Sequence, residues 1–288
     1  MSRRSLLFMP GNNPGMLINA DILGADTVVF DLEDAVALDE KDAARTLVRN
    51  ALNTLTFKHS EVSVRINPID SPYWEADLEY IVPAMPDSIV IPKASTEAVP
   101  MVEQRIEELR AKYNVEKEID TILLIESANG IMDIQNICKS SKLFTGLILG
   151  AEDYSSDMGV ERTKGNKEIE YARYVLATAA RAFRVDGIDT PYTDVDDMEG
   201  LMEDTGFAKS IGLGGRLLIN PRQVEYVHKV LSPTAEQIEE ASNILTESEI
   251  AKKQGLGVFS YKGKMVDLPV IKRAEATIEN AKKWGLIK

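Results

Sequence analysis

The chain has 288 residues, of which 44% are hydrophobic, so it can form one large barrel or two ordinary domains with a sizeable core. Its formal net charge of −13 argues against nucleic acid or an anionic membrane surface as the main partner. An anionic substrate would therefore need a local positive site, supplied by a metal ion or by a few arginines.

The residue inventory excludes several kinds of site. Cys138 is the only cysteine, so neither an intrachain disulfide nor a thiolate zinc site is possible, as is typical of a reducing cytoplasm. The two histidines, His59 and His228, are far apart and stand in no metal-ligand spacing. The apolar run at residues 6–9 is too short for a signal peptide, and no run approaches the roughly 20 residues of a membrane span. We expect a cytoplasmic protein that binds neither nucleic acid nor membrane.

Eight short apolar runs rich in β-branched residues predict β-strands. Most are near-continuous rather than alternating, which is typical of parallel strands buried on both faces. They span residues 5–9, 27–31, 61–67, 88–93, 121–126, 146–150, 186–190 and 216–220. The segments between them have helical character, for example residues 14–23, 40–52, 98–112 and 167–183, the last with a 3.6-residue apolar stripe.

Eight strand–helix alternations predict a (β/α)8 barrel for residues 1–230, with a doubly wound open sheet as the alternative. The sequence PGNNPG after the first run is not a dinucleotide fingerprint. The rest of the chain, residues 231–288, predicts a helical extension that acts as a lid over a barrel mouth, its own or a neighbour's. Its predicted parts are a helix at 235–253, a loop at 255–263 and a helix at about 268–284.

Polar and ionisable side chains appear where the predicted strands end. Active sites of such barrels form at the C-terminal ends of the strands, and a buried charge is costly unless it is paired or bound to a metal. These residues therefore predict a site. They are Asp31, Glu33, Asp34, Arg65, Asn67, Lys93, Glu126, Glu152, Asp153, Asp189 and Asn220.

Glu126 ends the fifth predicted strand and Asp153 follows the sixth, so we expect their carboxylates to approach one another. Two carboxylates without histidine or thiolate favour a hard cation that keeps several waters, and magnesium fits best. The alternative is a pair of solvated acids, each held by a helix N-terminus. Spacing alone favours neither interpretation.

Arg65 can clasp a substrate carboxylate through two parallel hydrogen bonds, or form a buried ion pair with Glu33 or Asp34. Lys93 can form the Schiff base of a metal-free aldolase, although pairing with nearby acids fits better. Asp31, Glu33 and Asp34 are expected to hold metal-bound water or to orient Arg65 and Lys93. Helix capping after the second strand fits them equally well.

Seven motifs, in register with the predicted strands, resemble the citrate lyase beta-subunit family. That family belongs to a larger group with malyl-CoA lyases, citramalyl-CoA lyases and 2-keto-3-deoxy-sugar-acid aldolases. The motifs are SLLFMPGN at residues 5–12, FDLEDAV at 30–36, VRIN at 64–67, IPK at 91–93, IES at 125–127, GAEDY at 150–154 and INP at 219–221. Residues 159–173 and 189–200 look most like true citrate lyase beta subunits.

The resemblance implies that Glu126 and Asp153 bind magnesium, that Arg65 binds the keto-acid carboxylate, and that Glu126 also lies near the substrate. Backbone N–H groups around Ala151, Glu152 and Asp153 are then expected to hold the keto acid.

Residues 263–269 resemble the family's lid. In relatives its aspartate, here Asp267, reaches into a neighbouring subunit's site and serves as the acid–base. The resemblance thus implies a homo-oligomer, a trimer or hexamer, whose lids are exchanged between subunits.

The implied substrate is a citryl thioester on coenzyme A or acyl carrier protein, cleaved to oxaloacetate and an acetyl thioester. The implied partners are citrate lyase alpha and gamma (acyl carrier) subunits. The alternatives are a stand-alone malyl-CoA or citramalyl-CoA lyase and a non-catalytic assembly subunit.

One segment departs from the family. Gly214, Gly215 and Arg216 stand where Phe-x-Gly-Lys is expected, which leaves the metal site untouched. The glycine turn at residues 212–215 can offer backbone donors to a phosphate, although glycine turns before a strand are common.

Overall fold

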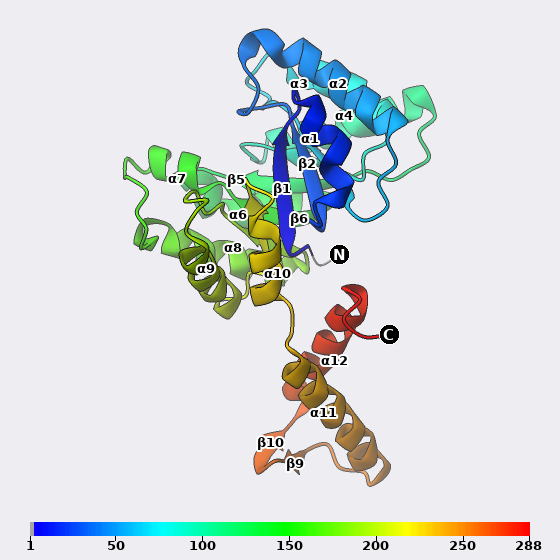
Figure 1. Cartoon of the computed structure of the whole chain (residues 1–288), viewed down its shortest axis with the longest axis vertical. Coiled ribbons are helices and arrows are strands. Elements are labelled where there is room, and N and C mark those ends of the chain that lie inside the picture. Colours follow the sequence, from blue (N-terminus) through cyan, green and yellow to red (C-terminus); the bar gives the residue numbers. More distant parts are fainter. Residues whose placement is uncertain (1–2) are drawn as a thin grey trace. The chain divides into compact units, whose positions relative to one another are not determined.

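The computed structural model describes residues 3–288, which divide into two compact units after His228. In the first unit, eight parallel strands form a closed barrel in chain order, and β8 pairs with β1 (Figure 1). The predicted (β/α)8 barrel is confirmed, and the open doubly wound sheet is wrong.

Each predicted run contains or overlaps a strand. The strands are β1 (Ser5–Pro10), β2 (Thr27–Asp31), β3 (Glu61–Arg65), β4 (Ser88–Ile91), β5 (Asp120–Ile125), β6 (Phe144–Leu149), β7 (Asp186–Asp189) and β8 (Gly215–Leu218). Several strands end one or two residues earlier than predicted, because polar residues such as Asn67 and Lys93 lie in the loops that follow.

The helices follow the strands in alternation. They are α1 (Pro14–Asn19), α2 (Lys41–Thr54), α3 (Trp74–Ile81), α4 (Ala98–Tyr113), α5 (Ala128–Met132), α6 (Ile134–Ser140), α7 (Ala151–Asp157), α8 (Glu170–Phe183), α9 (Met198–Ser210) and α10 (Gln223–Leu231). The predicted helix at 167–183 begins with the 3-10 turn Lys167–Ile169, and the one at 14–23 ends in the 3-10 turn Ala20–Ile22.

The barrel has two apolar layers, which explains why its strands are apolar on both faces. Side chains such as Leu6, Ile122 and Ile148 fill the interior of the barrel. Others, such as Leu123 and Leu147, point outward and pack in the layer between strands and helices. Because successive residues of a strand face opposite layers, each strand needs an unbroken apolar run.

The second unit, Lys229–Lys288, contains α11 (Ala235–Lys253), the antiparallel hairpin of β9 (Phe259–Tyr261) and β10 (Lys264–Val266), and α12 (Leu268–Lys283). Part of the predicted loop at 255–263 is therefore a strand. A small core that includes Ile244, Val266 and Ile271 joins these elements. Within residues 3–288 we find no helix that is long and apolar enough to cross a membrane.

Candidate active site

A cavity of about 440 Å³ is lined by residues at the C-terminal ends of the barrel strands. Apolar walls come from Phe8, Met9, Pro191, Leu217 and Ile219. Seven predicted site residues also line it: Asp31, Asp34, Arg65, Glu126, Ala151, Glu152 and Asp153. Polar groups from β2, β3, β5 and β6 thus converge on one space, as the barrel topology requires.

Three predicted residues, Glu33, Asn67 and Lys93, line a neighbouring cavity of about 450 Å³ that shares Asp34 with the first. Asp267 belongs to the second unit, where its side chain caps α12 by accepting the N–H of Val270 at 3.3 Å. Its predicted role as acid–base stays a prediction.

Glu126 follows β5 and is only 5% exposed. Its Oε1 accepts the backbone N–H of Lys93 at 2.5 Å. Burial raises the pKa of Glu126 to about 8, and the negative charges of Glu33 and Asp153 contribute to this rise. Arg65 opposes this rise only in part. Glu126 is therefore a buried and incompletely compensated carboxylate, an environment that a bound metal would relieve.

Gly150 makes room for Glu126. A Cβ at Gly150 would lie 2.6 Å from the Cβ and 2.8 Å from Oε2 of Glu126. The contact follows from the β5–β6 register, which sets Ile125 opposite Leu149 and lets the N–H of Gly150 bond to the carbonyl of Ile125. Sequence reasoning missed this function of Gly150.

Asp153 is the third residue of α7, directly after β6, and its exposed side chain lines the same cavity as Glu126. Among residues 3–288, no group of three or more His, Cys, Asp or Glu side chains is arranged around a metal position. A cation held here would complete its coordination with water or substrate oxygens, as Mg²⁺ commonly does. The two carboxylates fit magnesium, and their role as ligands stays a prediction.

Arg65 ends β3 and donates from Nε and Nη2 to the two carboxylate oxygens of Asp31, at 2.7 and 2.6 Å. Its Nη1 lies 2.8 Å from Glu33 Oε2 and 3.4 Å from Asp34 Oδ2. Burial opposes the charge, but the bond to Asp31 and the negative neighbours raise the pKa of Arg65 overall. The predicted buried ion pair thus exists, and Asp31 is its main partner.

Acidic side chains engage both sides of the Arg65 guanidinium. Of its five N–H donors, Asp31 accepts from Nε and Nη2, and Nη1 donates to Asp34 at 3.4 Å and faces Glu33. Asp31 also accepts the N–H groups of Glu33 and Ala35. Asp31 therefore orients Arg65. It does not cap a helix, because these two N–H groups belong to a turn, and the next helical segments begin at Leu38 and Lys41 without a side-chain cap.

Glu33 is 6% exposed, and burial raises its pKa to about 7 although Arg65 acts in the opposite direction. Lys93 adopts a left-handed backbone conformation with φ 45°, and its half-exposed Nζ lies 3.9 Å from Asp70 Oδ2. Lys93 thus pairs with an acid that the sequence did not single out. It contributes to the main site through the backbone N–H that holds Glu126.

The N-terminus of α7 is partly engaged. The N–H of Ala151 donates to Thr190 Oγ1 at 3.2 Å. This N–H was predicted to help hold the keto acid, but its hydrogen bond is already used. The first-turn N–H groups of Glu152 and Asp153 have no acceptor within their own helix. The Glu152 carboxylate pairs with Arg162 at 3.0 Å.

Asp189, a predicted rim residue, belongs instead to a buried cluster that we call the flank network: Arg173, Asp189, Asp204 and Arg216. Arg173 donates to both oxygens of Asp189 at 2.9 and 2.8 Å, and to both of Asp204 at 2.9 and 2.8 Å. Arg216, the family departure, lies 2.5 Å from Asp204 and 3.4 Å from Asp189.

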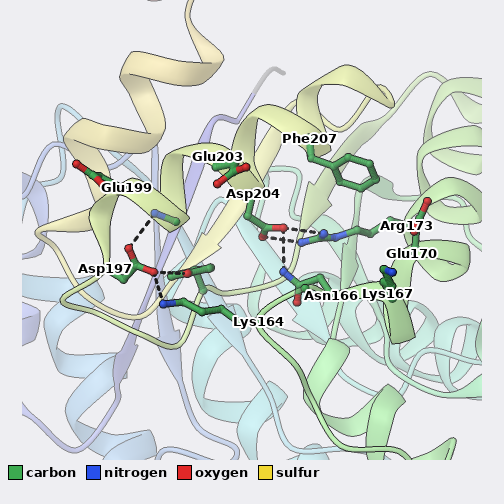
Figure 2. Close-up of a pocket in the computed structure, with 13 residues that line it drawn as sticks. Lys164, Asn166, Lys167, Glu170, Arg173, Asp197, Glu199, Glu203, Asp204 and Phe207 are labelled. Atoms are coloured by element: carbon green, nitrogen blue, oxygen red, sulfur yellow. Dashed lines mark hydrogen bonds and ion pairs between the residues drawn. The ribbon is translucent and has the colours of Figure 1, made fainter.

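Figure 2 shows Arg173 and Asp204 beside a separate cavity of about 560 Å³, with Lys164 and Asp197 paired nearby. The glycine turn that was considered for phosphate binding precedes β8, because Gly215 is the first residue of that strand. It therefore lies at the opposite end of the barrel from the candidate site, and phosphate binding by this turn stays a prediction.

Comparison with known proteins gives the chain its relatives. The model of the family HpcH/HpaI aldolase/citrate lyase matches residues 4–221. A protein named citrate lyase subunit beta, from Leuconostoc mesenteroides subsp. cremoris, is 41% identical over 97% of this chain and 93% of its own length. An L-malyl-CoA/beta-methylmalyl-CoA lyase from Cereibacter sphaeroides (strain ATCC 17025 / ATH 2.4.3) is 32% identical over 96% and 94%.

One solved structure is described as the citrate lyase beta subunit from M. tuberculosis complexed with oxaloacetate and magnesium. It superimposes on this chain with a TM-score of 0.67 at 28% identity, and covers 81% of this chain and 98% of its own.

Proposed function

The chain belongs to the HpcH/HpaI aldolase/citrate lyase family. We propose that it is a magnesium-dependent carbon–carbon lyase, the beta subunit of a citrate lyase in the cytoplasm. It cleaves a citryl thioester, carried by coenzyme A or acyl carrier protein, to oxaloacetate and an acetyl thioester. The observation that carries the proposal is the convergence of Glu126, Asp153 and Arg65 on one cavity.

Glu126 and Asp153 would hold the magnesium. Bound there, it would supply the positive charge that favours loss of the substrate's hydroxyl proton. The magnesium and oxaloacetate in the related M. tuberculosis structure support this reading.

Arg65, fixed on one edge by Asp31, binds the carboxylate next to the reacting carbon. When the carboxylate of Asp267, the proposed acid–base from a neighbouring subunit, accepts the hydroxyl proton, the carbon–carbon bond breaks, and its electron pair departs as the enolate of the acetyl thioester. The apolar walls, such as Pro191 and Leu217, exclude water while the enolate exists. In this way a protein of charge −13 binds an anion through local positive charge.

In this proposal Asp267 from a neighbouring subunit protonates the enolate. Residues 1–230 form the catalytic barrel and residues 231–288 the exchanged lid of a homo-oligomer, a trimer or hexamer. Alpha and gamma subunits are the further partners, as the relative's description as a subunit suggests.

Asp267→Asn tests the lid. Asparagine caps a helix as well as aspartate does, so α12 keeps its N-terminus while the proton donor is lost. We expect turnover to fall about 10²–10⁴-fold with unchanged Mn²⁺ affinity, measured by steady-state kinetics and electron paramagnetic resonance. Unchanged turnover would remove Asp267 from the mechanism.

The reaction itself is tested by coupled detection of oxaloacetate from citryl-CoA with Mg²⁺ or with EDTA. We expect release that EDTA abolishes. The similarity to an L-malyl-CoA/beta-methylmalyl-CoA lyase favours a second candidate, a stand-alone malyl-CoA or citramalyl-CoA lyase. A panel of citryl, malyl and citramalyl thioesters decides between the two.

Two further alternatives have their own tests. A Schiff-base aldolase would be trapped on Lys93 by borohydride; we expect no adduct, because Lys93 Nζ pairs with Asp70 and does not line the main cavity. A non-catalytic assembly subunit would cleave none of the three thioesters even with Mg²⁺.

A further inference from the structure

Helix α7 carries Asp153 but has only seven residues, Ala151–Asp157. A helix of this length has little stability of its own, because nucleation costs more than so few hydrogen bonds return. The orientation of Asp153 must therefore be set by the contacts that fix α7 to the barrel.

One fully buried contact joins Ala151 to Thr190. Both residues are 0% exposed, and the N–H of Ala151 donates to Thr190 Oγ1 at 3.2 Å. This N–H is one of the donors at a helix start that the helix itself cannot satisfy. Water does not reach it, so the Thr190 hydroxyl decides where α7 begins, two residues before Asp153.

Thr190 is itself held firmly. It directly follows Asp189, which is 0% exposed and receives two hydrogen bonds from Arg173. Pro191 comes next and restricts Thr190 to an extended backbone. The flank network, of which Figure 2 shows Arg173 and Asp204, thus fixes Asp189, the residue next to Thr190.

We propose that Thr190 is a positioning residue for the carboxylate of Asp153, acting through the N–H of Ala151 and anchored by the flank network. The proposal rests on the proposed function only in taking Asp153 as a metal ligand. Thr190 does not line the main cavity, so its effect is indirect.

The experiment compares Thr190→Val, Thr190→Ala and Thr190→Ser by Mn²⁺ binding to the full chain without substrate, followed by electron paramagnetic resonance. Val and Ala lose the acceptor, and Ser keeps it. We expect about tenfold weaker Mn²⁺ binding for Thr190→Val and Thr190→Ala and near wild-type binding for Thr190→Ser. Loss of a residue that orients a metal ligand typically has an effect of this size.

Thr121→Val is the matched control. Thr121 is also a fully buried threonine, in β5, and its Oγ1 donates to Glu103 at 3.0 Å without touching α7. We expect it to lower the melting temperature while leaving Mn²⁺ affinity unchanged. If Thr190→Val does not fold, the Ala and Ser pair gives the same comparison.

Wild-type Mn²⁺ affinity in both Thr190→Val and Thr190→Ala would overturn the inference, as would equal weakening by Thr121→Val. A wild-type protein that binds no Mn²⁺ would overturn both the inference and the metal site. A wild type that binds Mn²⁺ but cleaves no thioester would overturn the proposed function alone.

Discussion

Two of the buried arginine clusters in the barrel differ in charge balance. In the flank network two arginines meet two aspartates, and despite burial the arginines lower the pKa of Asp204 to about 2. At the candidate site, the single Arg65 meets three carboxylates, Asp31, Glu33 and Asp34.

The site also contains Glu126, so its negative charge is in excess. Burial raises the pKa of Glu33 to about 7 and that of Glu126 to about 8. A balanced cluster needs no ligand, whereas a buried excess of one sign is tolerated where an ion of the other sign binds. The two clusters therefore differ in whether their buried charges balance.

Glu126→Gln reduces the excess of negative charge at the candidate site, and we expect it to have the largest effect. It removes a proposed metal ligand, so we expect thioester cleavage to fall by roughly 10³-fold or more, measured with saturating Mg²⁺. The protein should stay folded, because the substitution removes a poorly compensated charge. Full activity in magnesium-limited buffer would contradict the assignment.

Arg173→Met makes the converse change in the flank network. It leaves Asp189 and Asp204 as buried charges with reduced compensation, so we expect a loss of about 3–5 kcal/mol in the free energy of unfolding, measured by urea denaturation. The control is Arg222→Met, which breaks the exposed pair with Asp196. A network variant as stable as this control would show that the network is not structural.

The candidate site and the flank network should also differ in how their stability depends on pH. The folded pKa values of Glu33 and Glu126 are raised, so their stabilising contribution is present below about pH 4.5 and is lost as the pH rises through 7 and 8. At most, Glu33 accounts for about 3 kcal/mol and Glu126 for about 5 kcal/mol. Asp204 has the opposite sign: its lowered pKa stabilises above about pH 4 and is lost as the pH falls through 2.

Metal-free protein should thus lose stability toward pH 8, and Mg²⁺ should restore it there more than at pH 5. Thermal unfolding across pH 4–9, with and without Mg²⁺, measures both effects. An equal stabilisation by Mg²⁺ at pH 5 and at pH 8 would mean that the carboxyl groups of Glu33 and Glu126 do not interact with the bound ion.

The sequence predicts the barrel because strands buried on both faces leave unbroken apolar runs. It also predicts Arg65, Glu126 and Asp153 as site residues, because each lies at the end of such a run or in the loop that follows it. It cannot tell Asp189 from Glu126, since both end strands. The difference lies in Arg173 and Arg216, which only the fold brings together.

Other features depend on contacts that sequence patterns do not reveal. Gly150 faces Glu126 only in the observed β5–β6 register. Thr190 meets Ala151 across two strand ends. The hairpin of Phe259–Tyr261 and Lys264–Val266 has strands of three residues, too short for a periodic signal.

The pairing that closes the barrel also bears on how the chain is made. Ser5 of β1 pairs with Arg216 of β8, about 210 residues later. At ~5–20 residues per second of synthesis, β1 keeps one unpaired edge for roughly 10–40 s before its partner exists. During translation the nascent protein therefore carries an open, apolar sheet edge, and protection of that edge on the ribosome would govern how much of the product escapes aggregation.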